Sequence, residues 1–120
     1  EAPTVAGLYL NRLRRGMRLQ ADPTLIYALG DFSIRRVLNV HRKIDSPYNT
    51  YKHSGLPPGP INFPEPGYLN AVLNADEHDF IFMCAREDFS GYHAFARTNR
   101  EHERNARRYR KALDKQGVYK

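Results

Sequence analysis

The residues best suited to chemistry lie in one short stretch of the sequence, where aromatic rings alternate with amide and hydroxyl groups. The stretch is Tyr48-Asn49-Thr50-Tyr51, and the loop from Gly55 to Ile61 follows it. Aromatic rings stack on the apolar face of a sugar, while amide and hydroxyl groups hydrogen-bond its polar substituents. Asn and Thr also satisfy the backbone of many ordinary loops. A carbohydrate-binding loop and a purely structural loop therefore both remain open on chemistry alone.

Other kinds of site find little support in the sequence. The glycine-rich stretch at 55–59 has prolines where a phosphate-binding loop needs backbone N–H donors, and no Gly-Lys-Ser/Thr follows it. No Gly-x-Ser-x-Gly motif of a serine hydrolase is present. The histidines are scattered without the spacing of a metal-ligand pair, and Cys84 has no second cysteine. We therefore predict no metal site and no cofactor.

The positive charge of the chain is confined to its C-terminal end. The 120 residues carry 19 Lys and Arg against 13 Asp and Glu, a net charge of 19 − 13 = +6. Residues 97–120 hold nine basic and three acidic residues, which accounts for 9 − 3 = +6, while residues 1–96 hold ten of each. A nucleic-acid binder would normally extend its charge onto the face with its aromatic residues, so we expect no nucleic-acid partner. The alternative is a noncatalytic module that binds an anionic surface or nucleic acid through a basic C-terminal helix.

Two helices are predicted at the start of the chain. Apolar residues recur at spacings of three and four from Val5 to Leu13, and Pro3 suits a first helical turn, so residues 3–15 form an amphipathic helix. Asp22 resembles an N-cap before a second helix, which ends at Gly30. The pattern of residues 31–44 fits neither helix nor strand clearly.

The second half of the chain combines a loop, two strands and a final helix. Residues 45–67 contain six of the eight prolines, which predicts a long ordered loop, because the stretch also carries several apolar side chains including Phe63. Residues 67–73 predict a short helix that buries its leucines and valine. Residues 80–85 and 92–96 predict a hairpin, and Thr98 begins a capping box that opens a basic helix.

Together these elements predict one domain over residues 1–120. Its class is α+β, with helices packed on a small antiparallel sheet, a long ordered loop rich in Pro and Gly, and a basic C-terminal helix. The chain opens without Met, has no signal-peptide pattern and contains no apolar run of about 18 residues. We therefore expect a fragment of a longer protein, whose membrane anchor would lie outside it.

Several segments together resemble one family far more specifically than any motif does alone. They occur in the same order as in the C-terminal part of the catalytic domain of endolytic murein transglycosylases, the YceG-like family. The segments are Val5–Leu13, Gly16–Thr24, Ser46–Tyr51, Gly55–Ile61, Ala71–Asn74, Phe80–Ala85, the Gly91-x-His93-x-Phe95 motif and Glu101-His102. The resemblance covers almost the whole chain.

The resemblance implies a lyase of the bacterial cell envelope, on the periplasmic or outer face of the inner membrane, whose parent is anchored by an N-terminal transmembrane helix. Its substrate would be nascent peptidoglycan glycan strands, cut between N-acetylmuramic acid and N-acetylglucosamine to leave 1,6-anhydro ends. Other cell-wall synthesis proteins are candidate partners. A single catalytic Glu serves in the family, and it lies a short distance upstream of Glu1. Glu1 is the alternative candidate, and residues 1–120 alone are expected to be inactive.

The resemblance also implies which residues line the substrate cleft. His93 belongs to this set, although a core histidine with a satisfied hydrogen bond is an equally good interpretation of it. Asp22 is likewise explained by its expected role as a helix cap. The full set is Gln20, Asp22, Thr24, Tyr48, Asn49, Thr50, Tyr51, Gly55, Leu56, Pro57, Pro58, Gly59, Pro60 and His93, with Ile61 at the end of the loop.

Overall fold

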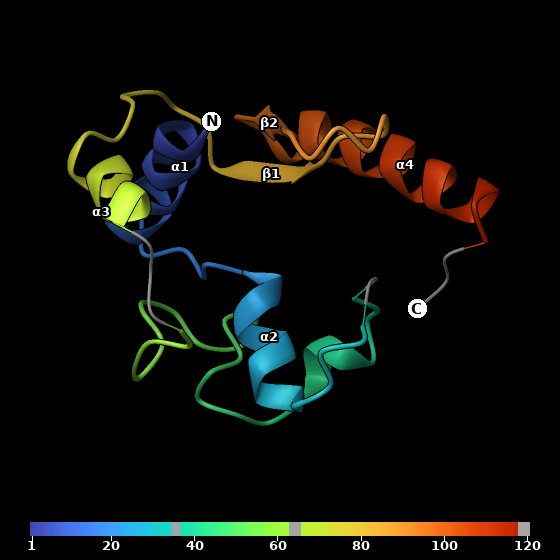
Figure 1. Cartoon of the computed structure of the whole chain (residues 1–120), viewed down its shortest axis with the longest axis horizontal. Helices are drawn as coiled ribbons and strands as arrows, with labels where there is room; N and C mark the ends of the chain where they lie inside the picture. The colour runs from blue at the N-terminus through green and yellow to red at the C-terminus, as the bar shows by residue number, and fades with distance from the viewer. Residues whose placement is uncertain (35–36, 63–65, 118–120) are drawn as a thin grey trace. The chain divides into compact units, whose positions relative to one another are not determined.

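The computed structural model describes residues 1–34, 37–62 and 66–117, which fall into two compact units. One unit comprises residues 1–11 and the described residues from Pro66 onward, and the other comprises the described residues from Arg12 to Asn62. The elements are α1 (Ala2–Arg14), α2 (Asp22–Leu29), a 3-10 turn η1 (His41–Lys43), α3 (Pro66–Leu73), β1 (Phe82–Ala85), β2 (His93–Ala96) and α4 (Asn99–Lys115), as Figure 1 shows. The predicted α+β class is confirmed.

The first unit is built around the hairpin of β1 and β2, with α4 along one of its faces (Figure 1). The strands are antiparallel, and their facing pairs are Phe82 with Ala96, Met83 with Phe95, Cys84 with Ala94 and Ala85 with His93. Facing pairs project to the same side of a sheet and alternate along it. The ring of Phe82 stacks on His102 of α4, so the Phe82 side faces the helix. His93 and Phe95 therefore lie on the side away from α4.

Helix α4 begins as its sequence predicts. The side-chain oxygen of Thr98 accepts a hydrogen bond from the backbone N–H of Glu101, which is the expected N-cap contact. Along one side of the helix, His102, Ala106 and Tyr109 are partly exposed, and Leu113 is buried. The basic side chains of α4 are all exposed.

A close approach of two segments holds the first turns of α1. Thr4 donates its hydroxyl hydrogen bond to Asp76 at 2.9 Å, and the carbonyl oxygen of Thr4 lies 2.8 Å from Nε2 of His78. Nδ1 of His78 accepts from the backbone N–H of Phe80 at 3.0 Å, so Nε2 is the protonated nitrogen that donates to Thr4. Gly7 permits this approach, because a Cβ there would lie 2.3 Å from the carbonyl oxygen of Asp76.

In the second unit, α2 starts differently from the prediction. Ala21 is the N-cap and makes no side-chain cap contact, and Asp22 is the first helical residue. The prediction of Asp22 as N-cap is therefore wrong. The helix nonetheless begins where the sequence indicates, because Pro23 suits the first turn and the acidic Asp22 complements the helix dipole. Gly30 ends it in the left-handed conformation, as expected.

The expectation that residues 67–73 bury their leucines and valine is also wrong. In α3 only Ala71 is buried, while Leu69, Val72 and Leu73 are 54%, 52% and 80% exposed. A short helix with apolar residues on several sides can bury only the side that meets the rest of its unit. Conversely, Arg12 of α1 is 5% exposed, because its guanidinium turns inward to donate to the carbonyl oxygen of Arg18 at 2.6 Å. Of the predicted loop over 45–67, residues 63–65, including Phe63, lie outside the described part.

Candidate functional site

The stretch that suggested sugar chemistry is organised around Asn49, which is fully buried. Its side-chain NH₂ donates to the carbonyl oxygens of Arg42 at 3.0 Å and Ile44 at 2.8 Å. Its side-chain oxygen accepts from the backbone N–H of Tyr51 at 3.0 Å. Asn49 thus folds its own loop, and it has no surface to offer a ligand in this conformation.

Thr50 joins the same loop to the start of α2. It is 2% exposed, and its hydroxyl oxygen accepts from the backbone N–H of Ala21 at 2.9 Å and lies 2.9 Å from the hydroxyl of Thr24. Thr24 is also buried and donates to the carbonyl oxygen of Ala21. Thr24 and Thr50 therefore hold the loop against the start of α2 through their hydroxyl groups. Any contact that they make with a glycan remains a prediction.

Tyr51 and Asp22 form the second link between these segments. The Tyr51 hydroxyl donates to the Asp22 carboxylate, and the guanidinium of Arg42 lies 4.9 Å above the Tyr51 ring. Burial raises the pKa of the Tyr51 hydroxyl, and the negative charge of Asp22 raises it further. Tyr51 therefore remains a proton donor to Asp22 at neutral pH, while the Asp22 residue itself is exposed.

An aromatic pair offers more accessible surface in the same unit. Tyr48 packs against Tyr27 of α2, with ring centroids 4.9 Å apart and planes tilted by 54°. Tyr27 is 41% exposed, so part of this pair faces solvent. The sequence reasoning missed Tyr27. Its exposed position near the end of α2 follows from helix geometry, but its contact with Tyr48 depends on the path of the loop.

The remaining predicted cleft residues of this unit lie mostly at the surface. Gln20 is exposed and adopts a positive φ of 50°, and its backbone N–H bonds the carbonyl oxygen of Thr50 at 3.1 Å. Leu56 is 74% exposed. Gly55, Pro57 and Gly59 are partly exposed, whereas Pro58 and Pro60 are exposed. This proline-stiffened loop presents surface to solvent, and its contact with substrate remains a prediction.

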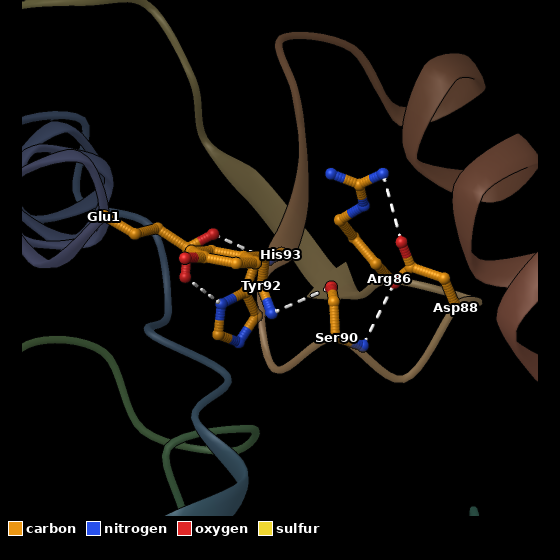
Figure 2. Close-up of polar contacts among 6 residues, drawn as sticks. All are labelled: Glu1, Arg86, Asp88, Ser90, Tyr92 and His93. Atoms are coloured by element: carbon orange, nitrogen blue, oxygen red, sulfur yellow. Dashed lines mark hydrogen bonds and ion pairs between the residues drawn. The ribbon is translucent and has the colours of Figure 1, made fainter.

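In the other unit, the structure brings Glu1 and His93 together (Figure 2). One carboxylate oxygen of Glu1 accepts from the backbone N–H of His93 at 2.6 Å, and the other lies 3.0 Å from Nδ1 of its ring. Partial desolvation acts to raise the pKa of Glu1, but the hydrogen bonds from the side chain and the backbone N–H of His93 lower that pKa overall. Glu1 therefore stays ionised, which makes it a poor proton donor.

Further rings continue from His93 along the hairpin face away from α4. The centroid of Phe95 lies 6.3 Å from His93 and 5.5 Å from Phe80, and Phe80 lies 4.8 Å from His78. The guanidinium of Arg97 sits 5.1 Å from the Phe80 ring. We call His93, Phe95, Phe80 and His78 the aromatic row. All four residues are partly exposed. Rings of this kind, beside a polar pair, suit contact with a sugar.

Other kinds of site find no residues in the described part of the chain. No group of three or more His, Cys, Asp or Glu side chains there could hold a metal ion. Among those same residues, no helix is long and apolar enough to cross a bilayer. The thiol of Cys84 is half-buried, and burial, with a contribution from Glu87, raises its pKa. A raised pKa disfavours the reactive thiolate.

Comparison with known proteins identifies what the chain is similar to. A sequence model of the YceG-like family matches residues 1–108. An endolytic murein transglycosylase of Bacillus subtilis is 40% identical over 105 residues, which cover 88% of this chain and 28% of that protein. An endolytic murein transglycosylase of Streptococcus pneumoniae is 33% identical over 105 residues, which cover 84% of this chain and 19% of that protein.

A solved structure agrees with these sequence relatives. The crystal structure of a YceG-like protein from Listeria monocytogenes is 38% identical and superposes with a TM-score of 0.79, covering 85% of this chain and 33% of that one. The chain thus spans a third or less of the length of each of these relatives.

Proposed function

The chain belongs to the YceG-like family, and we propose that it is the C-terminal part of the catalytic domain of an endolytic peptidoglycan transglycosylase. Such an enzyme would cut nascent glycan strands between N-acetylmuramic acid and N-acetylglucosamine and leave 1,6-anhydro ends. The observation that carries the proposal is the family match over residues 1–108, together with curated relatives named endolytic murein transglycosylase.

The described residues support a glycan as the ligand class. Exposed or partly exposed rings occur in both units, in the Tyr27–Tyr48 pair and in the aromatic row. Polar groups that can bond sugar hydroxyls occur in the same units, such as the exposed Asp22 in one and the partly exposed His93 in the other. Stacking with adjacent hydrogen bonding is the usual way in which proteins hold sugars.

The proposed mechanism uses one carboxyl group for two proton transfers. The group protonates the glycosidic oxygen as that bond breaks, and the carboxylate then takes the proton from the muramoyl 6-hydroxyl as this oxygen bonds the anomeric carbon. One residue serves both steps, because the second returns the proton that the first gave away. Ordinary glycoside hydrolases use two carboxylates instead. The family resemblance puts this Glu upstream of Glu1, so we expect residues 1–120 to be inactive alone, with the parent anchored in the cell membrane.

The test is turnover of purified peptidoglycan by the full-length protein. We expect fragments with 1,6-anhydro ends, detected by mass spectrometry, and their complete loss when the upstream Glu is replaced by Gln. Fragments with reducing ends would indicate hydrolysis and contradict the proposal. Unchanged turnover by the Gln variant would contradict the assignment of that Glu.

Helix α4 supports a second, noncatalytic candidate function. Its seven basic side chains are all exposed, and one of them, Arg110, pairs with Glu103 at 3.8 Å. A basic helix face attracts anionic lipid headgroups and, less selectively, nucleic acid. We expect the change of Arg104, Arg107, Arg108 and Arg110 to Gln to weaken binding to anionic vesicles while glycan cleavage in solution continues. Salt-sensitive DNA binding lost in the same variant would favour a nucleic-acid module instead.

A further inference from the structure

The contact between Glu1 and His93 has a geometry that a simple surface ion pair lacks. Both carboxylate oxygens are used, one on the backbone N–H and one on ring Nδ1 of the same residue, at 2.6 and 3.0 Å. Two contacts fix the direction of the carboxylate as well as its distance. The imidazole is thus held in a defined orientation, as Figure 2 shows.

The contact also determines which ring nitrogen carries the proton. A carboxylate only accepts hydrogen bonds, so Nδ1 of His93 must be the N–H donor. In the neutral ring, Nε2 then has a lone pair and is an acceptor. Across the described ranges, no residue makes a hydrogen bond to Nε2. The His93 side chain is 33% exposed, so this acceptor is accessible.

The turn before His93 is closed by contacts among its own residues. Asp88 accepts from the backbone N–H of Ser90 at 3.1 Å and pairs with Arg86 at 3.2 Å. The backbone N–H of Arg86 bonds the carbonyl oxygen of Tyr92 at 3.0 Å, which closes the turn just before β2. These contacts, drawn in part in Figure 2, make the position of His93 at the start of the strand well defined.

The surroundings of Nε2 suit a sugar better than an anion. His93 lies at one end of the aromatic row, beside Phe95 at 6.3 Å. Its orienting partner Glu1 is negatively charged, which disfavours an anionic ligand. A neutral hydroxyl group can donate to Nε2 while the attached sugar ring covers the aromatic side chains.

We propose that Glu1 and His93 form a glycan-contacting pair, in which Nε2 of His93 accepts a hydrogen bond from a sugar hydroxyl and Glu1 is the positioning residue that sets the orientation and tautomer of the ring. The inference rests on the proposed function, because it takes the glycan as ligand. It goes beyond that function by giving Glu1 a role other than proton donation.

The sharpest variant is His93→Asn in the full-length protein. The Asn side-chain NH₂ can replace Nδ1–H as donor to Glu1, and the backbone contact is retained, but no group replaces Nε2. A pair that only stabilises the fold would therefore tolerate this change. We expect KM for soluble glycan strands to rise about tenfold with kcat within about twofold, as befits one lost hydrogen bond to the substrate.

The variant Glu1→Gln tests the positioning role. It keeps the length of the side chain and removes the charge that selects the Nδ1–H tautomer, so we expect a smaller rise in KM. The matched control is Glu87→Gln, an exposed acid on the same hairpin that lies outside the proposed pair. Thermal unfolding of each variant serves as the check on folding.

If a variant fails to fold, a spectroscopic measurement on the wild-type protein tests the proposed role of His93 Nε2. In wild-type protein with ¹⁵N-labelled histidine, the His93 Nε2 signal should be that of an unprotonated nitrogen at neutral pH and should shift when glycan is added. A protonated Nε2, or a signal that saturating glycan leaves in place, would overturn the proposal. So would an unchanged KM in a folded His93→Asn protein, or a loss confined to kcat. If the wild-type protein releases no anhydro-ended glycan, the proposed function fails instead, and the tautomer measurement still tests the role of Glu1.

Discussion

Each unit contains a carboxylate bound to a ring side chain, and the two pairs differ in what they leave available. In the Glu1–His93 pair, the ring retains an accessible acceptor nitrogen. In the Asp22–Tyr51 pair, the single polar atom of the ring is already engaged, and Arg42 lies over its face. The two pairs therefore differ in what they offer a ligand, because a ligand can bond only to polar atoms that are not already hydrogen-bonded within the protein.

The protonation states of Glu1 and Tyr51 also differ between the two pairs. The pKa of Glu1 is lowered overall, so the carboxylate stays charged and orients its partner. The pKa of Tyr51 is raised by burial and by Asp22, so the hydroxyl stays neutral and donates. In both pairs the proton remains on the ring residue. Only in His93 does this leave a second nitrogen for other contacts.

The largest expected effect comes from Asn49→Asp, which should break the loop that carries Tyr51. The new carboxylate would face the carbonyl oxygens of Arg42 and Ile44 in place of the NH₂ that now bonds both. We expect local stability to fall by about 3 kcal/mol. Hydrogen exchange of residues 41–53 in the full-length protein measures it. Asn62→Asp, at an exposed position, is the control, and equal protection in both variants would contradict the central role of Asn49.

Gly7→Ala should disturb the Glu1–His93 pair, because it displaces the start of α1. The added Cβ would lie 2.3 Å from the Asp76 carbonyl oxygen and 2.8 Å from His78 Nε2, so the segment must move. We expect a loss of about 2 kcal/mol in the free energy of unfolding. A lower unfolding temperature would show it. Gly67→Ala in α3 is the matched control, because a Cβ there meets nothing within 4 Å and Ala favours helix.

Tyr51→Phe sharpens the comparison, because it removes the hydroxyl contact and leaves the ring under Arg42. We expect about 1 kcal/mol less stability at neutral pH. Since the folded-state pKa of Tyr51 is raised, the neutral hydroxyl stabilises the fold fully below the ordinary Tyr value of about 10, and this contribution is lost as the pH rises further. Denaturation at increasing pH should therefore show an alkaline fall in wild type that is shallower in the variant. An equally steep alkaline loss of stability in both proteins would contradict a stabilising contact between the Tyr51 hydroxyl and Asp22.

Glu1→Gln should have the smallest effect on stability and should appear only on the acid side. Because the folded-state pKa of Glu1 is lowered, its contribution is present above the ordinary Glu value and is lost as the pH falls through the lowered value. The wild-type protein should thus lose slightly more stability than the variant between about pH 5 and pH 3. Parallel acid denaturation curves would argue against a charged contact between Glu1 and His93.

The sequence predicted the secondary structure well because the signals for it are local. Gly30 ends α2 as expected, and Thr98 caps α4 as its spacing with Glu101 indicates. The burial of side chains was harder to predict. Leu73 has the composition of a core residue but is 80% exposed, because the described part of its unit packs against Ala71 instead.

The candidate site could be predicted only in outline. The rings and amides of residues 48–51 left a sugar-binding loop and a structural loop both open. In the structure, Asn49 and Thr50 hydrogen-bond backbone groups of Arg42 and Ala21, and Tyr27 is an additional exposed ring. Whether these residues touch a glycan remains a prediction. From its place in an alternating strand, His93 could be either a core residue or a site residue. Its contact with Glu1 motivates the proposal that it is a site residue.

The amino-acid sequence by itself determined the helices, the hairpin, the basic face of α4 and the family, since each depends on residue types at short spacing or on motifs in order. Only the tertiary structure decided that Glu1 meets His93, 92 residues along the chain, and that Asp22 meets Tyr51 and does not cap its helix. The physical reason is that a hydrogen bond needs two groups within about 3 Å and in line. The path of the backbone between such groups sets that geometry, and no periodicity in the sequence records it.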